Sequence, residues 1–199
     1  MTDFWVGTIS ALVMGYLLGS IPFGLLLTKF TGGGDIRSIG SGNIGATNVL
    51  RTGRKGLAAL TLLLDLLKGF AAVWLAQQYF AGSEAIAAAG AFFGHLYPVW
   101  LSFKGGKGVA TYAGIMFGLL WQGGVIYAVT WIGALLIFRI SSVAGLLAAL
   151  VAPLAAAYFG RYDLVAMLVA CSLIIFWKHR ANIENLINGT EPRIGKSKS

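Results

Sequence analysis

The chain has 199 residues, of which 57% are hydrophobic and 11% are charged, and its mean hydropathy is +0.78. A soluble domain carries about 25% charged residues, so this composition excludes a soluble globular protein and predicts an integral membrane protein. The formal net charge of +8 falls mainly in the connections between apolar segments. Basic residues in such connections set membrane orientation, so the charge does not indicate nucleic-acid binding.

We predict a single all-α membrane domain over residues 1–199, with a flexible tail over 195–199. The apolar residues occur in stretches of roughly membrane-spanning length, which is typical of a helical bundle and not of a barrel. Two of these stretches are shorter than the roughly 20 residues that a straight span needs, so six or eight spans are alternatives to seven. The predicted helices cover residues 4–30, 56–79, 84–101, 108–122, 124–138, 142–159 and 163–178.

Two of the predicted helices contain residues that are unusual in a membrane span. In the first, Gly15, Gly19, Pro22 and Gly24 favour close helix packing or a kink. In the second, Asp65 and Lys68 lie three positions apart on one helical face. Charges at that depth are costly, so this pair is expected either to neutralise itself or to border a polar site.

The first polar segment is Gly40–Arg51, with the sequence GSGNIGATNVLR. Glycines let consecutive backbone N–H groups turn toward an anion, hydroxyl and amide side chains add donors, and an arginine adds a guanidinium. The structural alternative is a polar turn in which Thr47 and Asn48 cap a helix that begins near Val49. The candidate phosphate-binding residues are Ser41, Gly42, Asn43, Gly45, Thr47, Asn48 and Arg51.

The second polar segment, with the sequence KGGKG, directly precedes the fourth predicted helix. Two ammonium groups and three glycines beside a helix N-terminus favour an anion, because the helix dipole adds to the charge of the lysines. A simple membrane anchor would need the lysines but not the glycines. The candidates here are Lys104, Gly105, Gly106, Lys107 and Gly108.

The third polar segment follows the last predicted helix. His179 and Asn182 would share a face if that helix continues, and the histidine is either a base or phosphate donor, or an interfacial residue between two basic neighbours. Ser142, at the start of the sixth predicted helix, is interpreted as an N-cap in preference to a site hydroxyl. His95, near the end of the third, is similarly open to both kinds of role.

The distribution of Lys and Arg predicts the membrane topology. With the amino terminus outside, every basic residue in a connection falls on the cytoplasmic side except Arg161, which predicts a cytoplasmic carboxy terminus and places all three polar segments in the cytoplasm. The seven Asp and Glu residues are scattered, so no metal site is expected, and the GxSxG motif of serine hydrolases is absent. The sequence therefore predicts an enzyme or carrier for phosphorylated lipids or their precursors.

The three segments GSGNIGATNVLR, GHLYPVWLSFKGGKGVAT and KHRANIENLINGTEP resemble the motifs of the bacterial acyl-phosphate:glycerol-3-phosphate acyltransferase family. The resemblance covers essentially the whole chain, and the chain differs from the family pattern at Asn185, where the family often has arginine. It implies transfer of a fatty acyl group from acyl phosphate to the 1-hydroxyl of glycerol 3-phosphate, giving lysophosphatidate and phosphate. It also implies a multi-pass enzyme of the bacterial inner membrane, which we expect to be a monomer without cofactor or metal.

The resemblance implies a role for each polar segment. The first would hold one phosphate, Lys104 and Lys107 the other, and Ser142 with the third segment would complete the polar rim. Acyl phosphate has a good leaving group, so the reaction needs positioning and charge stabilisation more than a covalent intermediate. The proton acceptor is either His179 or the substrate's own phosphate. The expected catalytic residues are Ser41, Arg51, Lys104, His179 and Asn182.

The main alternative is a transporter or channel for an anion such as phosphate or glycerol phosphate. The short, glycine-interrupted fourth and fifth helices motivate it. The absence of an evident inverted repeat, and the short links without polar character on the outer side, count against it.

Overall fold

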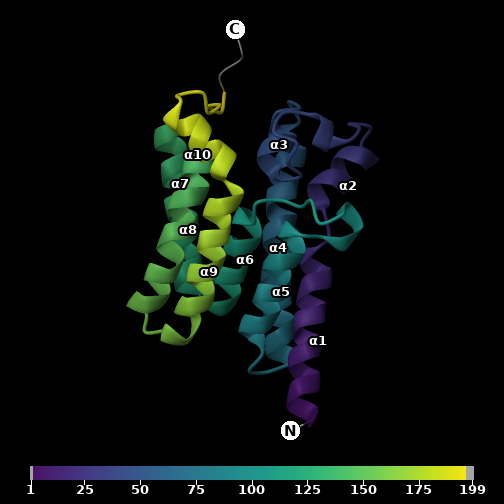
Figure 1. Ribbon diagram of the computed structural model, residues 1–199, viewed down its shortest axis with the longest axis vertical. Coiled ribbons are helices and arrows are strands. Elements are labelled where there is room, and N and C mark those ends of the chain that lie inside the picture. The colour runs from purple at the N-terminus through teal and green to yellow at the C-terminus, as the bar shows by residue number, and fades with distance from the viewer. Residues whose placement is uncertain (1, 196–199) are drawn as a thin grey trace. The chain divides into compact units, whose positions relative to one another are not determined.

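The computed structural model describes residues 2–195, with side chains from residue 5 onward, and this part of the chain is helical without strands (Figure 1). The chain divides by its internal contacts into two compact units, Met1–Leu119 and Leu120–Ser199, and the single membrane domain stays a prediction. Of the expected tail 195–199, only Gly195 lies within the described residues. The first unit contains α1 (Thr2–Gly19), α2 (Phe23–Phe30), η1 (Ile36–Ser38), α3 (Ala46–Leu50), α4 (Lys55–Tyr79), α5 (Glu84–Leu96), η2 (Val99–Leu101) and α6 (Val109–Leu119). The second contains α7 (Trp121–Phe138), α8 (Ser141–Tyr158), α9 (Tyr162–Lys178) and α10 (Arg180–Ile187).

Glycines bring α1 and α5 into backbone contact in the first unit. A Cβ atom at Gly15 or Gly19 would collide with backbone atoms of Ala87 or Ala91 on α5. In return, a Cβ at Gly90 would collide with the backbone of α1. Small residues at a helix interface allow this close approach, which is how membrane helices associate without a hydrophobic driving force. The packing interpretation of the α1 glycines is confirmed.

The first predicted helix, 4–30, is broken into α1 and α2 at residues 20–22. Pro22 precedes α2 and cannot donate a backbone hydrogen bond, which ends α1 at this point. The carbonyl groups released by the break find other donors: the Trp100 indole donates to Ser20 O at 2.7 Å, and the Lys68 ammonium donates to Ile21 O at 2.8 Å. The break is therefore a packed part of the first unit.

Length and hydropathy allow four segments of the described chain to cross a membrane: Trp5–Phe30, Lys55–Tyr79, Trp121–Phe138 and Ser141–Tyr158. A fifth is possible if α9 and α10, which meet at an angle of 58°, form one span. The predicted helix 84–101 is shorter than expected, because α5 ends at Leu96 just before Pro98. Helix α6 has only 11 residues, so seven full-length spans stay a prediction.

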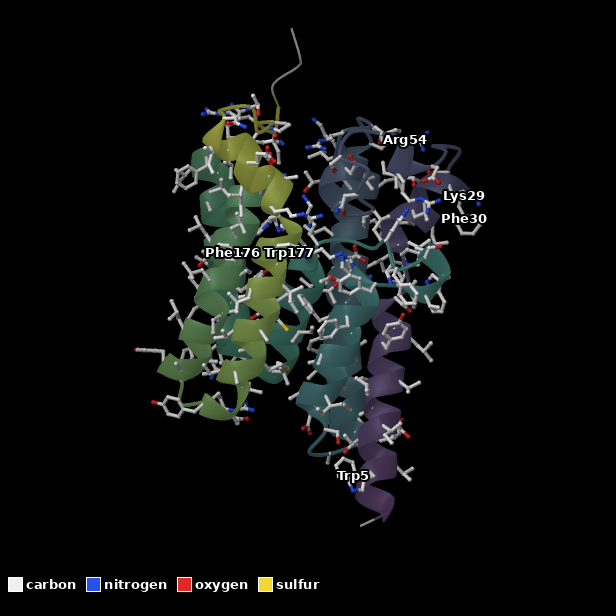
Figure 2. The ribbon with its side chains drawn as sticks, viewed as in Figure 1. Trp5, Lys29, Phe30, Arg54, Phe176 and Trp177 are labelled. Atoms are coloured by element: carbon white, nitrogen blue, oxygen red, sulfur yellow. The ribbon has the colours of Figure 1, made fainter. Side chains whose placement is uncertain are left out.

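The two ends of the first unit differ in character (Figure 2). Trp5 lies near the amino-terminal end of α1, whereas Lys29, Phe30 and Arg54 gather at the end that contains α2 and the start of α4. The Arg54 guanidinium donates to the backbone oxygen and to the hydroxyl of Thr31, both at 2.9 Å. The end of this unit that contains α2 and the start of α4 therefore carries the basic residues Lys29 and Arg54.

The second unit is built around α8, which packs against both α7 and α9. Six of the nine buried residues of α8 are alanine, and serine and glycine add two more small side chains, so its neighbours can approach closely. The Ser172 hydroxyl on α9 donates to Ala149 O on α8 at 2.7 Å and ties the two helices together.

Candidate active site

Asn48 organises the first polar segment. Its amide nitrogen lies 2.9 Å from each of three backbone oxygens, those of Ile36, Ile39 and Asn43, and its side-chain oxygen accepts from the N–H of Ser41 at 3.2 Å. The residue is 1% exposed, and both polar atoms of its side chain form hydrogen bonds with the loop backbone. We conclude that Asn48 acts through the shape of the loop and does not present its amide to a ligand.

Two glycines allow the loop to curl around Asn48. Gly40 and Gly42 have φ values of 57° and 68°, a region that residues with a Cβ rarely adopt. A Cβ at Gly40 would also collide with the side-chain oxygen of Asn48 and crowd the Arg51 side chain. Arg51 therefore lies against Gly40, with its guanidinium exposed to solvent.

The structural alternative for this segment, in which Thr47 and Asn48 cap a helix that begins near Val49, is wrong. Helix α3 begins at Ala46, and its N-cap is Gly45, which has no side chain to make a capping bond. The Asn43 side-chain oxygen accepts from the N–H of Gly45 at 2.9 Å and shapes the approach to the helix. Thr47 lies inside α3, half-buried, and Ser41 is exposed on the loop.

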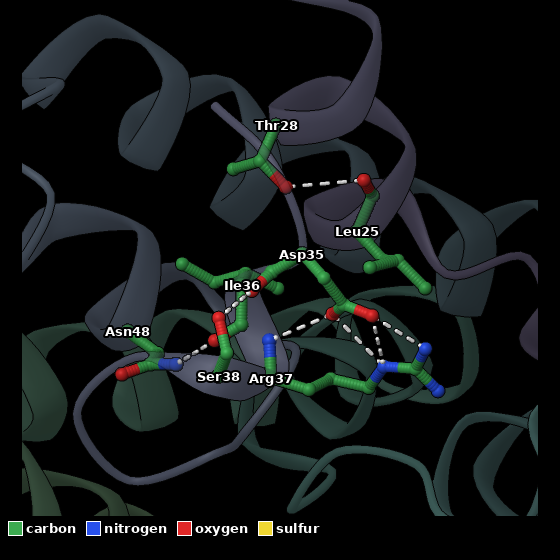
Figure 3. Close-up of polar contacts among 7 residues, drawn as sticks. All are labelled: Leu25, Thr28, Asp35, Ile36, Arg37, Ser38 and Asn48. Atoms are coloured by element: carbon green, nitrogen blue, oxygen red, sulfur yellow. Dashed lines mark hydrogen bonds and ion pairs between the residues drawn. The ribbon is translucent and has the colours of Figure 1, made fainter. Parts of the chain in front are cut away.

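An ion pair that the sequence reasoning missed holds the start of this loop (Figure 3). The Asp35 carboxylate accepts from the backbone N–H of Arg37 at 2.9 Å and from its guanidinium at 2.6 Å, and it caps η1. The hydrogen bonds from Arg37 lower the pKa of Asp35 to about 2. The only available signal was an acidic residue two positions before a basic one in a glycine-rich turn.

The second polar segment folds back onto the end of α5. The N–H of Gly105 donates to Leu96 O at 3.1 Å, and the N–H of Gly106 donates to His95 O at 3.0 Å. These two N–H groups were expected to face an anion, and the structure instead uses them to fix the loop. Lys104 is exposed, and Lys107 is half-buried.

Gly108 leads into α6. Its φ of 90° requires glycine, and α6 starts at the next residue. The segment therefore places its lysines immediately before a helix N-terminus, as predicted from the sequence.

Arg51 and Lys104 share one property within the described part of the first unit: neither makes an ion pair with a carboxylate. Asp65 and Lys68 behave in the opposite way, because their charged atoms lie 2.6 Å apart and both side chains are buried. The buried pair neutralises itself, which was one of the two expected outcomes. The exposed guanidinium and ammonium keep their charges available for an anionic ligand.

In the second unit, Glu191 gathers three side chains. Its Oε1 atom accepts from the Ser142 hydroxyl at 2.7 Å and from the Asn182 amide at 2.6 Å, while Oε2 accepts from the Asn185 amide at 3.3 Å. Ser142 is not an N-cap, because Ile140 holds that position without a side-chain bond. Glu191 was not singled out from the sequence, although it is the only carboxylate in the polar segment after α10.

His179 lies at the bend between α9 and α10 and is 4% exposed. Its Nδ1 atom is 2.8 Å from Ile175 O. A carbonyl oxygen only accepts, so Nδ1 carries the hydrogen and the neutral ring has its lone pair on Nε2. That tautomer gives His179 a basic nitrogen.

The described residues contain no group of three or more His, Cys, Asp and Glu side chains with the spacing of a metal site. The polar segments of the first unit offer hydroxyls, amides and cations, and the segment of the second unit offers amides, an imidazole and the Glu191 carboxylate. Hydroxyls, amides and cations are groups that bind anions.

Comparisons with known proteins agree with this chemistry. The family model for glycerol-3-phosphate acyltransferase matches residues 9–189. The glycerol-3-phosphate acyltransferase of Erythrobacter litoralis is 62% identical over 93% of this chain and 94% of that protein. The corresponding protein of Mesorhizobium japonicum is 59% identical over 95% of this chain and 97% of that protein.

Two crystal structures share the fold. The integral membrane glycerol 3-phosphate acyltransferase PlsY, in its glycerol 3-phosphate form, has a TM-score of 0.89 and 36% identity, over 94% of this chain and 96% of that one. Its lysophosphatidic acid form has a TM-score of 0.87 and 35% identity, over 94% and 95%.

Proposed function

This chain belongs to the glycerol-3-phosphate acyltransferase family and is an integral membrane enzyme with that activity, and from this premise we propose that its acyl donor is an acyl phosphate and its product is lysophosphatidate. The forms of the related PlsY with glycerol 3-phosphate and with lysophosphatidic acid support this acceptor and this product. The observation that carries the proposal is that Arg51 and Lys104, one in each polar segment of the first unit, are exposed and make no ion pair with a carboxylate among the residues that the structure describes. A guanidinium and an ammonium each form charge-assisted hydrogen bonds with phosphate oxygens, so the two groups suit two phosphorylated substrates.

In the proposed reaction, the 1-hydroxyl oxygen of glycerol 3-phosphate attacks the acyl carbon of the acyl phosphate. The new ester C–O bond forms, the C–O bond to phosphate breaks, and inorganic phosphate leaves with the bonding electron pair. The hydroxyl proton passes to a base. Because phosphate is a good leaving group, the protein contributes orientation and charge stabilisation and needs no covalent acyl-enzyme.

The roles of the first unit follow from its loops. We assign Arg51, Ser41, Asn43 and Thr47 to one phosphate, with Gly40, Gly42, Gly45 and Asn48 shaping the loop around them. Lys104 and Lys107 take the other phosphate or stabilise the departing one, and Gly108 places them at the start of α6, where the helix dipole also favours negative charge. Gly105 and Gly106 hold the loop through their bonds to α5.

We propose that two side chains of the second unit bind the acceptor substrate while Glu191 holds them in place. The Ser142 hydroxyl, which donates its hydrogen to Glu191, would accept from a substrate hydroxyl, and the Asn182 amide would donate its second N–H to a substrate oxygen. His179 is a candidate proton acceptor, because the bond from Nδ1 to Ile175 O leaves the basic lone pair on Nε2. The substrate's own phosphate is the alternative proton acceptor. In that case His179 would only orient glycerol 3-phosphate.

We further propose the topology that the basic residues predict, with the amino terminus outside, seven spans and the polar segments facing the cytoplasm of a bacterial inner membrane. Within the first unit, the basic cluster of Lys29 and Arg54 at one end of α1 and α4 supports this orientation. Labelling tests it: a membrane-impermeant maleimide should modify Ala81→Cys in intact cells and Lys55→Cys only after lysis. The reverse pattern would contradict the topology.

Steady-state phosphate release tests the function. Purified protein given an acyl phosphate and glycerol 3-phosphate should release phosphate and form lysophosphatidate in equal amounts, with no product when acyl-CoA replaces the acyl phosphate. Lys104→Ala and Arg51→Ala should each lower kcat/KM by about a hundredfold, as expected for loss of a charged group that stabilises the transition state. Full turnover with acyl-CoA alone would contradict the acyl-phosphate donor, and full turnover of both variants would contradict these assignments.

The proton acceptor has its own test. His179→Gln keeps a polar side chain but has no basic nitrogen. If His179 is the base, kcat falls by about a hundredfold or more. Near-normal kcat would assign the proton to the substrate phosphate.

A further inference from the structure

The mechanism gives no role to the buried charged pair of the first unit, which Asp65 and Lys68 form on α4. Their charged atoms are 2.6 Å apart, and their side chains are 4% and 2% exposed. The Lys68 ammonium also donates to Ile21 O at the break between α1 and α2, and it lies 5.8 Å from the centre of the Phe23 ring. The pair therefore connects α4 to the broken first span.

Stability alone does not explain this pair. Replacing a buried ion pair by apolar residues of similar volume is often neutral or stabilising, because desolvation offsets the Coulombic gain. A charged pair near the middle of a membrane helix is more often linked to function. The question is what the pair acts on.

The neighbour of the pair that leads to the site is His95, near the end of α5. Its Nδ1 atom is 3.8 Å from Asp65 Oδ1, which is longer than a hydrogen bond but close enough for the carboxylate to orient the ring electrostatically. The side chain is 4% exposed. His95 is therefore enclosed between α4 and the loop that follows α5.

That loop is the second polar segment, and it rests on His95 in two ways. The His95 carbonyl accepts the N–H of Gly106 at 3.0 Å. A Cβ at Gly106 would collide with Nε2 of the His95 ring, and a Cβ at Gly105 would collide with the His95 carbonyl oxygen. The imidazole lies against Gly106 and the His95 carbonyl lies against Gly105, the two glycines that separate Lys104 from Lys107.

We propose that His95, oriented by the buried Asp65–Lys68 pair, is a positioning residue that fixes the loop Phe103–Gly108 and with it the two lysines. The buried pair orients the His95 ring, and the ring contacts Gly106. The backbone of Gly106 in turn determines where the ammonium groups of the two lysines lie. The claim that this arrangement aids catalysis rests on the function proposed above for Lys104. The claim that it fixes the loop conformation does not depend on that function, so the two claims can be tested separately.

The main variant is the double substitution Asp65→Leu with Lys68→Met, which removes both charges and approximately keeps the volume. The loop is observed through a nitroxide label on Phe103→Cys, an exposed position, in a Cys171→Ala background that removes the single native thiol. The double variant should increase the mobility of the label and lower kcat/KM by about ten- to a hundredfold, the loss expected when catalytic groups are misplaced.

The matched control is Ser172→Ala in the second unit. It removes a buried hydrogen bond to Ala149 O, which lowers stability by about 1 kcal/mol, and this bond joins α8 and α9 within the second unit. Ser172→Ala should lower the thermal midpoint and leave both the label mobility and kcat/KM within about twofold of the parent. A purely structural role for the Asp65–Lys68 pair would give the same result as this control.

A second pair of variants applies if the double substitution fails to fold. His95→Asn keeps a nitrogen at the position of Nδ1, facing Asp65, whereas His95→Leu removes it. The label should be mobile in His95→Leu and closer to the parent in His95→Asn. An unchanged label spectrum in the folded double variant, or in both His95 variants, would overturn the proposal.

The two proposals fail in different ways. If Lys104→Ala keeps full turnover while Asp65→Leu with Lys68→Met mobilises the label, the role proposed for Lys104 is wrong and the positioning of the loop stands. If Lys104→Ala abolishes turnover while the label does not respond to any of the variants, the role of the lysine stands and the positioning proposal is overturned.

Discussion

At the scale of single residues, Glu191 organises the polar side chains of the second unit, because its carboxylate accepts hydrogen bonds from three of them. One of its oxygen atoms accepts from both Ser142 and Asn182. Glu191→Ala would remove the acceptor of the buried Ser142 hydroxyl, at a cost of about 1–3 kcal/mol, and one acceptor of the half-buried Asn182 amide. We expect a drop in thermal midpoint and a fall in kcat of at least about tenfold, measured on protein purified in detergent.

Glu191→Gln should be intermediate, because the amide oxygen can still accept from Ser142 and Asn182 while its NH₂ group faces the amide of Asn185. The matched control is Glu184→Gln, the same change at an exposed position of α10, which should stay within about twofold of the parent. Glu191→Ala with parental kcat and thermal midpoint would contradict this role.

Asp35 gives a prediction about pH. Hydrogen bonds from Arg37 lower the pKa of Asp35 from 3.8 to about 2 in the folded protein. The pair therefore stabilises the folded loop when the pH is above the pKa of Asp35 in the unfolded chain, and this stabilisation is lost as the pH falls through the pKa of Asp35 in the folded protein. From about pH 5 to 9 the contribution should be constant. The ratio of kcat/KM between the parent and Asp35→Asn should therefore be flat over this range, and a ratio that changes near neutral pH would contradict the assignment.

Residue types in the polar segments indicate the kind of ligand, whereas contacts between residues far apart in the sequence could not be predicted. The role of Arg51 and Lys104 as anion ligands stays a prediction, and neither makes an ion pair with a carboxylate among the described residues. The central place of Asn48 in its loop, and of Glu191 beside Ser142, depends on backbone carbonyls and side chains that only the fold brings together. Local patterns carry no information about such contacts.

At the scale of helices, the glycine-lined contact between α1 and α5 can be tested with two substitutions on the same helix. A Cβ at Gly15 would collide with the backbone carbonyl of Ala87, whereas a Cβ at Gly7 has no atom within 4 Å. Gly15→Ala should destabilise the protein by about 1–3 kcal/mol, as overpacking does. Gly7→Ala should be neutral or stabilising by up to about 1 kcal/mol, since alanine favours helix.

Thermal unfolding in detergent measures both variants. Equal midpoints for Gly15→Ala and Gly7→Ala would contradict the close approach of the two helices. The apolar segments themselves were predictable from their periodicity and length. Their interruptions were harder to place, because the end of α1 depends on Pro22 together with the donors from Trp100 and Lys68 that satisfy the released carbonyls.

At the scale of the whole molecule, the composition was sufficient to predict the class of protein, and the sequence motifs were sufficient to predict the family. An all-helical membrane protein follows from hydropathy, and the three polar segments lead to the glycerol-3-phosphate acyltransferases, as the comparisons confirm. The division into two compact units was not anticipated. It depends on contacts between residues far apart in the sequence, and such contacts produce no periodic pattern of residue types. Each unit carries its own organised polar cluster, around Asn48 and the lysine loop in one and around Glu191 in the other.

The central claim is that the protein transfers the acyl group directly between two phosphorylated substrates, by orientation and charge stabilisation alone. Rapid mixing of stoichiometric enzyme with acyl phosphate tests it, with released phosphate followed in the presence and absence of glycerol 3-phosphate. We predict one phosphate per lysophosphatidate formed when glycerol 3-phosphate is present, and no burst without it. A burst of phosphate equal to the enzyme concentration in the absence of glycerol 3-phosphate would show a covalent acyl-enzyme and contradict direct transfer.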